Sequence, residues 1–82
     1  MWINSDNKLQ RKLVFKDFMQ AMDFINRMAT IAEKLNHHPN FSNSWNKVNI
    51  EITTHSAGNV VTEKDFQLAE EIDKILLSMK IS

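Results

Sequence analysis

The residues in this sequence best suited to chemistry are its three histidines, two of which stand before the only proline as His37-His38-Pro39. Histidine is the one side chain whose ordinary pKa lies between pH 5 and 8, so grouped imidazoles can give and take protons at neutral pH. The third, His55, lies further along the chain. The histidines therefore suit general acid-base chemistry, provided that the fold brings them together.

The proline also predicts where a helix ends. A residue that precedes proline is biased from helical toward extended backbone, so we expect the helix before His38 to end near Leu35 or Asn36. Both imidazoles would then lie at that helix end. A helix stop beside the negative end of the helix dipole explains the pair equally well on local grounds, and spacing alone favours this structural role.

The elements before the pair are predicted from apolar periodicity. Alternation over Leu9–Phe15 predicts a strand, and Trp2-Ile3 is a candidate partner strand because Asn4–Asn7 are turn formers. Asp17 and Gln20 fit a capping box that begins a helix. Its apolar stripe consists of Phe18, Ala21, Met22, Ile25, Met28, Ala29, Ala32 and Leu35.

The elements after the pair read as a hairpin and a second helix. The predicted strands Phe41–Trp45 and Val48–Thr54 flank a turn at Asn46-Lys47, and alternation places His55 on the polar side at the end of the second strand. Thr62 and Asp65 form a capping box, which explains Asp65 without any functional site. The inward stripe of the second helix is predicted as Phe66, Ala69, Ile72, Leu76 and Met79.

This order of elements predicts an α+β fold, a two-layer sandwich in which a small antiparallel sheet of about four strands carries two helices on one face. We expect a single domain over residues 1–82. A domain of this size buries only about 60% of the surface that its unfolded chain exposes. We therefore predict a homo-oligomer, with a dimer as the minimal unit.

Composition excludes several classes of function. Ten basic residues balance ten acidic ones, so nothing suggests a nucleic-acid binder, and the absence of cysteine excludes a disulfide, a thiolate nucleophile or a cysteine-based zinc site. One glycine does not support a phosphate cradle, and no G-x-S-x-G turn is present. No stretch is apolar for the length of a membrane span and no signal peptide is evident, so we expect a soluble cytoplasmic protein.

A metal site built from His37, His38, His55 and Asp65 is conceivable. Adjacent histidines tend to point in different directions, however, and the spacings typical of zinc sites are absent. The sequence therefore predicts neither a metal nor another cofactor.

The histidine pair also belongs to a longer motif that resembles a known family, the pterin-4a-carbinolamine dehydratases. The likeness extends upstream to Trp2, Leu13 and Phe15–Phe18, and the sequence begins at about the tryptophan that usually follows an N-terminal helix in this family. The matching motif comprises Glu33-Lys34-Leu35-Asn36-His37-His38-Pro39, Trp45, Val48-x-Ile50, Thr53-Thr54-His55 and Thr62-Glu63-Lys64-Asp65.

The resemblance implies a reaction and a set of site residues. Such enzymes dehydrate a 4a-hydroxytetrahydropterin to the quinonoid dihydropterin without a metal, using histidines as acid and base. By resemblance, His37, His55 and Asp65 surround the pterin, His38 and Pro39 complete the pocket wall, and Glu33 and Thr54 support it.

The resemblance also implies partners: a reduced pterin as substrate, further copies in a homodimer or homotetramer, and an aromatic amino-acid hydroxylase. Animal members act in addition as the dimerisation cofactor of a homeodomain transcription factor. A non-catalytic dimerisation or assembly partner of another protein is therefore the alternative function. The joint presence of His37, His55 and Asp65 favours the enzyme, because a pure adaptor does not need all three.

Overall fold

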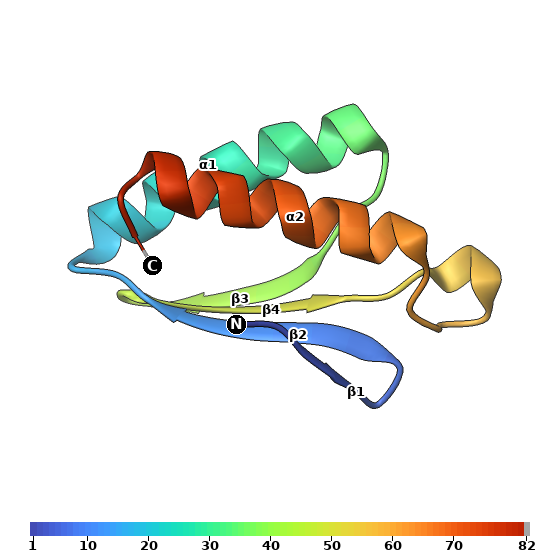
Figure 1. The fold of residues 1–82 in the computed structure, drawn as a ribbon. Coiled ribbons are helices and arrows are strands. Elements are labelled where there is room, and N and C mark those ends of the chain that lie inside the picture. The colour runs from blue at the N-terminus through green and yellow to red at the C-terminus, as the bar shows by residue number, and fades with distance from the viewer. Residues whose placement is uncertain (82) are drawn as a thin grey trace.

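A four-stranded antiparallel sheet with two long helices on one face makes up the protein, as predicted (Figure 1). The computed structural model describes residues 1–81, so Ser82, the last residue of the predicted domain, lies outside the described residues. The elements are β1 Ile3–Ser5, β2 Lys8–Val14, α1 Phe18–Leu35, β3 Asn40–Ser44, β4 Lys47–Ile52, the short 3₁₀ helix η1 His55–Ala57, and α2 Glu63–Ser78.

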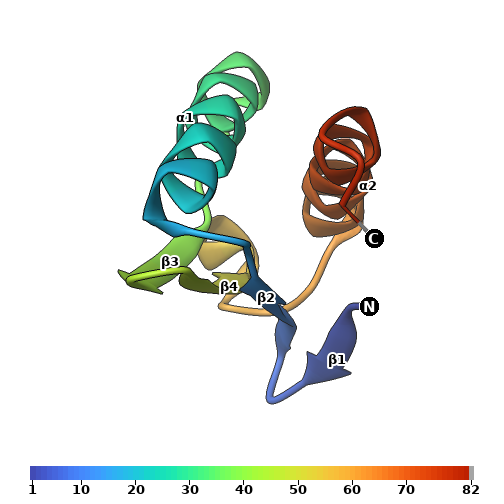
Figure 2. The same ribbon diagram turned by 90° about the vertical axis from the view of Figure 1, so that its left-hand side faces the viewer.

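The strand order is β1-β2-β4-β3, so β4 lies between β2 and β3, the two strands that α1 connects. The two helices lie side by side over one face of the sheet (Figure 2). The predicted alternation is confirmed, because Val48, Ile50 and Ile52 are fully or almost fully buried. Leu9 and Leu13 of β2 pair with Ile52 and Val48 and extend this apolar face.

Both hairpin turns differ from the sequence prediction. The first consists only of Asp6 and Asn7, both at positive φ, so β1 begins at Ile3 and continues through Asn4 and Ser5. Two-residue hairpin turns favour Asp and Asn because these residues tolerate the left-handed region. Trp2 precedes the strand, and its indole Nε1 donates a hydrogen bond to Asp73 of α2 at 2.8 Å.

The second turn lies at Trp45-Asn46, so the prediction of Asn46-Lys47 was wrong by one residue. Asn46 is tied to the end of β2, because its carbonyl accepts from Phe15 N–H at 2.8 Å and its Nδ2 donates to the Phe15 carbonyl at 2.9 Å. Asn43 Nδ2 donates to the carbonyls of Trp45 and Lys47 across the turn. These side-chain bonds hold Trp45 at φ 52°.

The ends of α1 follow the prediction closely. Asp17 caps the helix by accepting the Gln20 N–H at 2.8 Å, although Gln20 Oε1 returns its bond to Lys16 N–H rather than to Asp17. At the other end, Asn36 is left-handed at φ 51° and His37 N–H donates to the Ala32 carbonyl. This is a Schellman-type stop, which turns the chain so that His37 follows the helix directly.

The buried helix faces are rotated relative to the predicted stripes. In α1, Phe24 is buried against Phe15 whereas Phe18 and Ala29 are exposed. In α2, Leu68 and Ile75 join the predicted core, and Phe66 is 53% exposed. Asp65 points inward at the start of α2, and successive helical residues differ by about 100° in direction, so Phe66 is carried outward.

The buried sheet face predicts where substitutions destabilise the protein. Ile50→Ala, at a side chain that is 1% exposed, should lower the free energy of unfolding by about 2–5 kcal/mol because it leaves a cavity in the core. Urea denaturation measures this loss. Ile3→Ala is the matched control, since Ile3 is 63% exposed and its truncation should cost less than about 1 kcal/mol. Equal losses at the two positions would contradict this packing.

Candidate active site

The predicted site residues come from segments that meet at one end of the molecule. The C-terminal end of α1, the segment from β4 into η1, and the N-terminal end of α2 lie together at the right of Figure 1. His37 follows the left-handed Asn36 that ends α1, while Asp65 occupies the first turn of α2. The fold thus joins segments far apart in the sequence.

The central contact is between His37 and Asp65. His37 Nε2 lies 2.7 Å from Asp65 Oδ1, and the two side chains are 13% and 0% exposed. A buried carboxylate needs several donors to offset its loss of water. The histidine supplies one of them and remains the part of the pair that solvent can reach.

The second oxygen of Asp65 is held by the backbone and side chains around the start of α2. Oδ2 accepts the Thr54 hydroxyl at 2.7 Å and the Thr62 N–H at 2.8 Å. The Thr54 and Thr62 hydroxyls are themselves 2.7 Å apart. The predicted capping role of Asp65 is therefore confirmed, and its buried carboxylate lies behind the partly exposed His37.

The pKa of Asp65 reflects two opposed effects. Burial by itself raises the pKa of this carboxyl, but hydrogen bonds from His37, Thr54 and the Thr62 N–H, together with the charge on His37, lower it below its ordinary value. Asp65 is thus ionised at neutral pH. Because an ionised carboxylate only accepts, His37 Nε2 donates, and Nδ1 is the nitrogen free to accept a proton in the neutral ring.

His38 forms a separate, exposed pair with Glu33. Its Nε2 lies 2.5 Å from Glu33 Oε2, and the two side chains are 56% and 78% exposed. Exposed ion pairs contribute about 0–1 kcal/mol, so this contact orients the ring more than it stabilises the fold. Pro39 follows as a partly buried residue between the pair and β3.

The sequence predicted that His55 ends a strand, and this prediction was wrong. β4 ends at Ile52, Thr54 forms only an isolated bridge with Val60, and His55 begins η1 with an exposed side chain. The strand ends early because Thr54 turns its hydroxyl toward Asp65 and its carbonyl accepts from Ala57 and Asn59 N–H. His55 Nδ1 lies 2.5 Å from Asn59 Oδ1.

The structure therefore unites some of the predicted residues and separates others. His37, Thr54 and Asp65 share one network, whereas the side chains of the pairs His38–Glu33 and His55–Asn59 make no hydrogen bond to it within residues 1–81. Over the same residues, no three His, Asp or Glu side chains gather as metal ligands, so the four that were considered do not converge. Sequence reasoning missed Asn59, although asparagine beside the only glycine is a signal for left-handed backbone.

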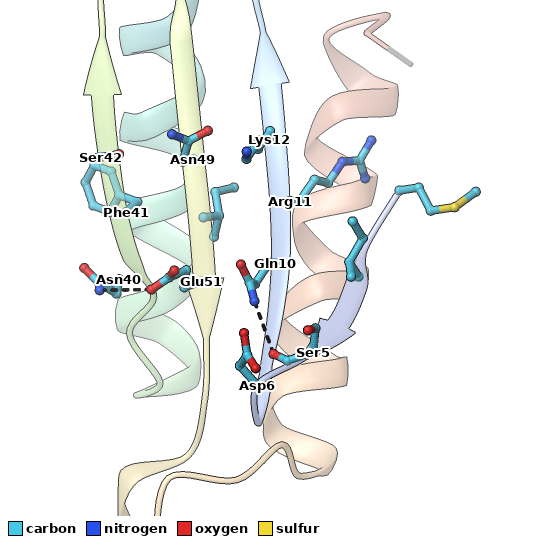
Figure 3. A pocket seen from close by; sticks show the side chains of 13 residues that line it. Ser5, Asp6, Gln10, Arg11, Lys12, Asn40, Phe41, Ser42, Asn49 and Glu51 are labelled. Carbon is cyan, nitrogen blue, oxygen red and sulfur yellow. Dashed lines mark hydrogen bonds between the residues drawn. The ribbon is translucent and has the colours of Figure 1, made fainter.

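A concave region lies on the face of the sheet opposite the helices. This hollow, about 810 Å³ in volume, is lined by polar side chains of β2, β3 and β4, among them Gln10, Lys12, Asn49 and Glu51 (Figure 3). None of the predicted site residues lines it. No helix among the described residues has the length and apolar character needed to cross a bilayer.

The fold and the site define a class of small α+β proteins with a histidine-carboxylate site at one end of the helical layer. The model of the family described as Pterin 4 alpha carbinolamine dehydratase matches residues 1–75. The chain therefore belongs to the pterin-4a-carbinolamine dehydratase family, as its motifs had implied.

Individual relatives agree with this assignment. A protein of Picosynechococcus sp. provisionally named pterin-4-alpha-carbinolamine dehydratase is 46% identical over 74 residues, which cover 90% of this chain and 79% of the relative. A protein of Sulfolobus acidocaldarius with the same provisional name is 42% identical, with 90% and 80% covered. Both matches therefore cover most of this chain and most of the relative.

Solved structures share the fold. A structure from Brucella melitensis described as a transcriptional coactivator/pterin dehydratase is 39% identical, with a TM-score of 0.85 and coverage of 90% of this chain and 80% of that one. A pterin dehydratase-like protein described as a RuBisCO assembly factor has a TM-score of 0.76 at 22% identity, with 90% and 87% covered. The second likeness concerns the fold alone.

The buried carboxylate predicts a pH-dependent effect on stability. At pH 7, Asp65→Asn should lower the free energy of unfolding by at least about 2 kcal/mol, because an amide cannot replace a carboxylate that accepts from several donors. A lowered pKa means that this stabilisation is complete above about pH 4 and is lost as the pH falls through the folded-state value. Urea unfolding between pH 7 and pH 3 should therefore show a shrinking deficit.

Asp23→Asn provides the matched control for this measurement. Asp23 pairs with Arg27 at an exposed position of α1, so its loss should cost less than about 1 kcal/mol. A deficit at Asp65 that stays constant down to pH 3 would contradict the assigned role of the ionised carboxylate.

Proposed function

We propose that this protein dehydrates a 4a-hydroxytetrahydropterin to the quinonoid dihydropterin, with histidines as acid and base. The observation that carries the proposal is the contact between partly exposed His37 and buried, ionised Asp65. Family membership supplies the substrate class. The pairing is the arrangement in which a carboxylate orients an imidazole and stabilises its protonated form.

The reaction requires two proton transfers and no redox change. The proton on N5 leaves, its electron pair forms the C4a–N5 double bond, and the C4a–O bond breaks. The hydroxyl group takes up a proton and departs as water. A base near N5 and an acid near the hydroxyl are therefore sufficient, and each typically contributes about 10²–10⁴-fold in rate.

The contacts of the histidines suggest how these roles divide. His37 takes the N5 proton on Nδ1, because the Asp65 carboxylate at Nε2 stabilises the resulting positive ring. His55, whose contact is the neutral Asn59 amide, gives a proton to the departing hydroxyl. Thr54 supports Asp65, while exposed His38, oriented by Glu33, and Pro39 form the substrate-binding wall.

The proposed reaction implies a source for the substrate. Aromatic amino-acid hydroxylases form hydroxypterins of this kind, so such an enzyme in the cytoplasm would supply the substrate. The chain's own side chains suffice for the proton transfers, and we assign it no cofactor.

The alternative is a non-catalytic role as a dimerisation or assembly partner of another protein. The name of the Brucella structure, which pairs a coactivator with a dehydratase, supports keeping this alternative. The two functions make different demands on the histidines, because a partner surface does not require an ionised carboxylate behind His37. Catalysis therefore discriminates between them.

Histidine substitutions test the proposed reaction. The 4a-hydroxypterin is generated transiently, and its ultraviolet absorbance decay is followed without added metal. Wild type should accelerate the decay, whereas His37→Ala and His55→Ala should each lose about 10²–10⁴-fold of the acceleration after the uncatalysed rate is subtracted. His38→Ala is the matched control, since its ring is held in an exposed pair and it should mainly raise KM.

Wild-type decay no faster than the uncatalysed reaction would reject the dehydratase proposal in favour of the assembly partner. A loss of kcat for His38→Ala as large as that for His37→Ala would contradict the division of roles.

We further propose that the protein is a homodimer or homotetramer. Within residues 1–81, β3 pairs only with β4 and leaves one edge free, and Trp45 and Leu77 are 67% and 72% exposed. Free sheet edges and exposed apolar side chains favour association. Light scattering at micromolar concentration should give a multiple of the 9.6 kDa chain mass, and the mass of a single chain would contradict the proposal.

A further inference from the structure

We propose that Asn59 is a positioning residue for His55: its side-chain oxygen holds Nδ1 of the ring, so that Nε2 is the nitrogen presented to the substrate. The contact is Nδ1 to Oδ1 at 2.5 Å, and both residues are exposed. This inference rests on the proposed function for its place in the reaction. Its structural content, which nitrogen carries the proton, stands independently.

The loop that carries Asn59 is closed by its backbone. Asn59 N–H donates to the Thr54 carbonyl at 3.1 Å, and Gly58 N–H donates to the His55 carbonyl at 3.0 Å. Gly58 and Asn59 both lie in the left-handed region, at φ 88° and 60°. The side chain of Asn59 is therefore not needed to close the turn, and its contact with His55 has a separate consequence.

That consequence is the tautomer of His55. An amide oxygen only accepts, so the neutral ring must carry its proton on Nδ1 and its lone pair on Nε2. Neutral His37 is the opposite tautomer, with its proton on Nε2, because Asp65 accepts a hydrogen bond from that nitrogen. Its acceptor is also a charged carboxylate, whereas the acceptor for His55 is a neutral amide.

This difference matches the roles that the reaction needs. The neutral imidazole backed by a carboxylate is suited to accept the N5 proton on Nδ1. The imidazole backed by an amide releases a proton from Nε2 when its ring is doubly protonated, and it then returns to the neutral form with its remaining proton on Nδ1. Asn59 therefore makes the two histidines chemically unlike. It also extends the site by a residue whose side chain contacts the acid without taking part in proton transfer.

The backbone conformation of Asn59 can be adopted by glycine and by aspartate, so its side chain can be changed without straining the turn. Glycine tolerates φ 60° and removes the side-chain oxygen, whereas aspartate also tolerates left-handed backbone and keeps an acceptor. Asn59→Gly should therefore remove only the imidazole contact, and Asn59→Asp should preserve it. Asn7→Gly is the matched control, because Asn7 also lies at φ 60° and its carbonyl bond to Thr53 does not involve its side chain.

The experiment measures ¹⁵N chemical shifts of the His55 ring by NMR, at a pH where the ring is neutral, in the full chain without ligand. Wild type, Asn59→Asp and Asn7→Gly should show a protonated Nδ1 and an unprotonated Nε2. Asn59→Gly should lose this preference and shift toward the Nε2-protonated form. Thermal unfolding of each variant identifies any that fails to fold, and Asn59→Asp then still tests the inference.

An unprotonated Nδ1 in wild type, or a tautomer unchanged by Asn59→Gly, would overturn the inference whether or not the protein is a dehydratase. In an active enzyme, Asn59→Gly should lower kcat by about 10-fold, less than the loss of the imidazole itself. A changed tautomer with an unchanged kcat would overturn the positioning role. Absence of dehydratase activity in wild type would instead count against the proposed function and leave the NMR result to decide the tautomer.

Discussion

The buried carboxylate of Asp65 is the interaction on which the rest of this structure depends. One oxygen is held by His37 and the other by Thr54 and the Thr62 N–H, so a single side chain links the end of α1, the segment after β4 and the start of α2. An ionised group removed from water is tolerated only when all its hydrogen bonds are made. Stability and chemistry at this end of the molecule therefore have the same origin.

This dependence explains the local departures from regular structure. Thr54 leaves the sheet because its hydroxyl is required at Asp65, which ends β4 early and starts the 3₁₀ turn at His55. Phe66 is turned outward because its neighbour Asp65 points inward. The left-handed Asn36 stops α1 one residue before His37. Each feature brings a donor to the carboxylate or follows from doing so.

The site is also graded in exposure and charge. Asp65 is fully enclosed, His37 is partly exposed, and His38, His55 and Asn59 are exposed. The carboxylate thus lies in a low-dielectric environment, where the electrostatic interaction between Asp65 and His37 is strongest. The histidines remain accessible to a ligand.

Local patterns in the sequence determined the fold class, the strand alternation of Val48, Ile50 and Ile52, and the end of α1, because propensities, period and caps act over a few residues. They also marked the three histidines as candidates, whereas the role of Asp65 came from the resemblance to the family. Only the tertiary structure decided that Asp65 is enclosed against His37, that His55 lies in a turn beside Asn59, and that Phe18 and Phe66 are exposed. These outcomes depend on contacts between distant segments and on helix rotation against the sheet, which no short stretch of sequence encodes.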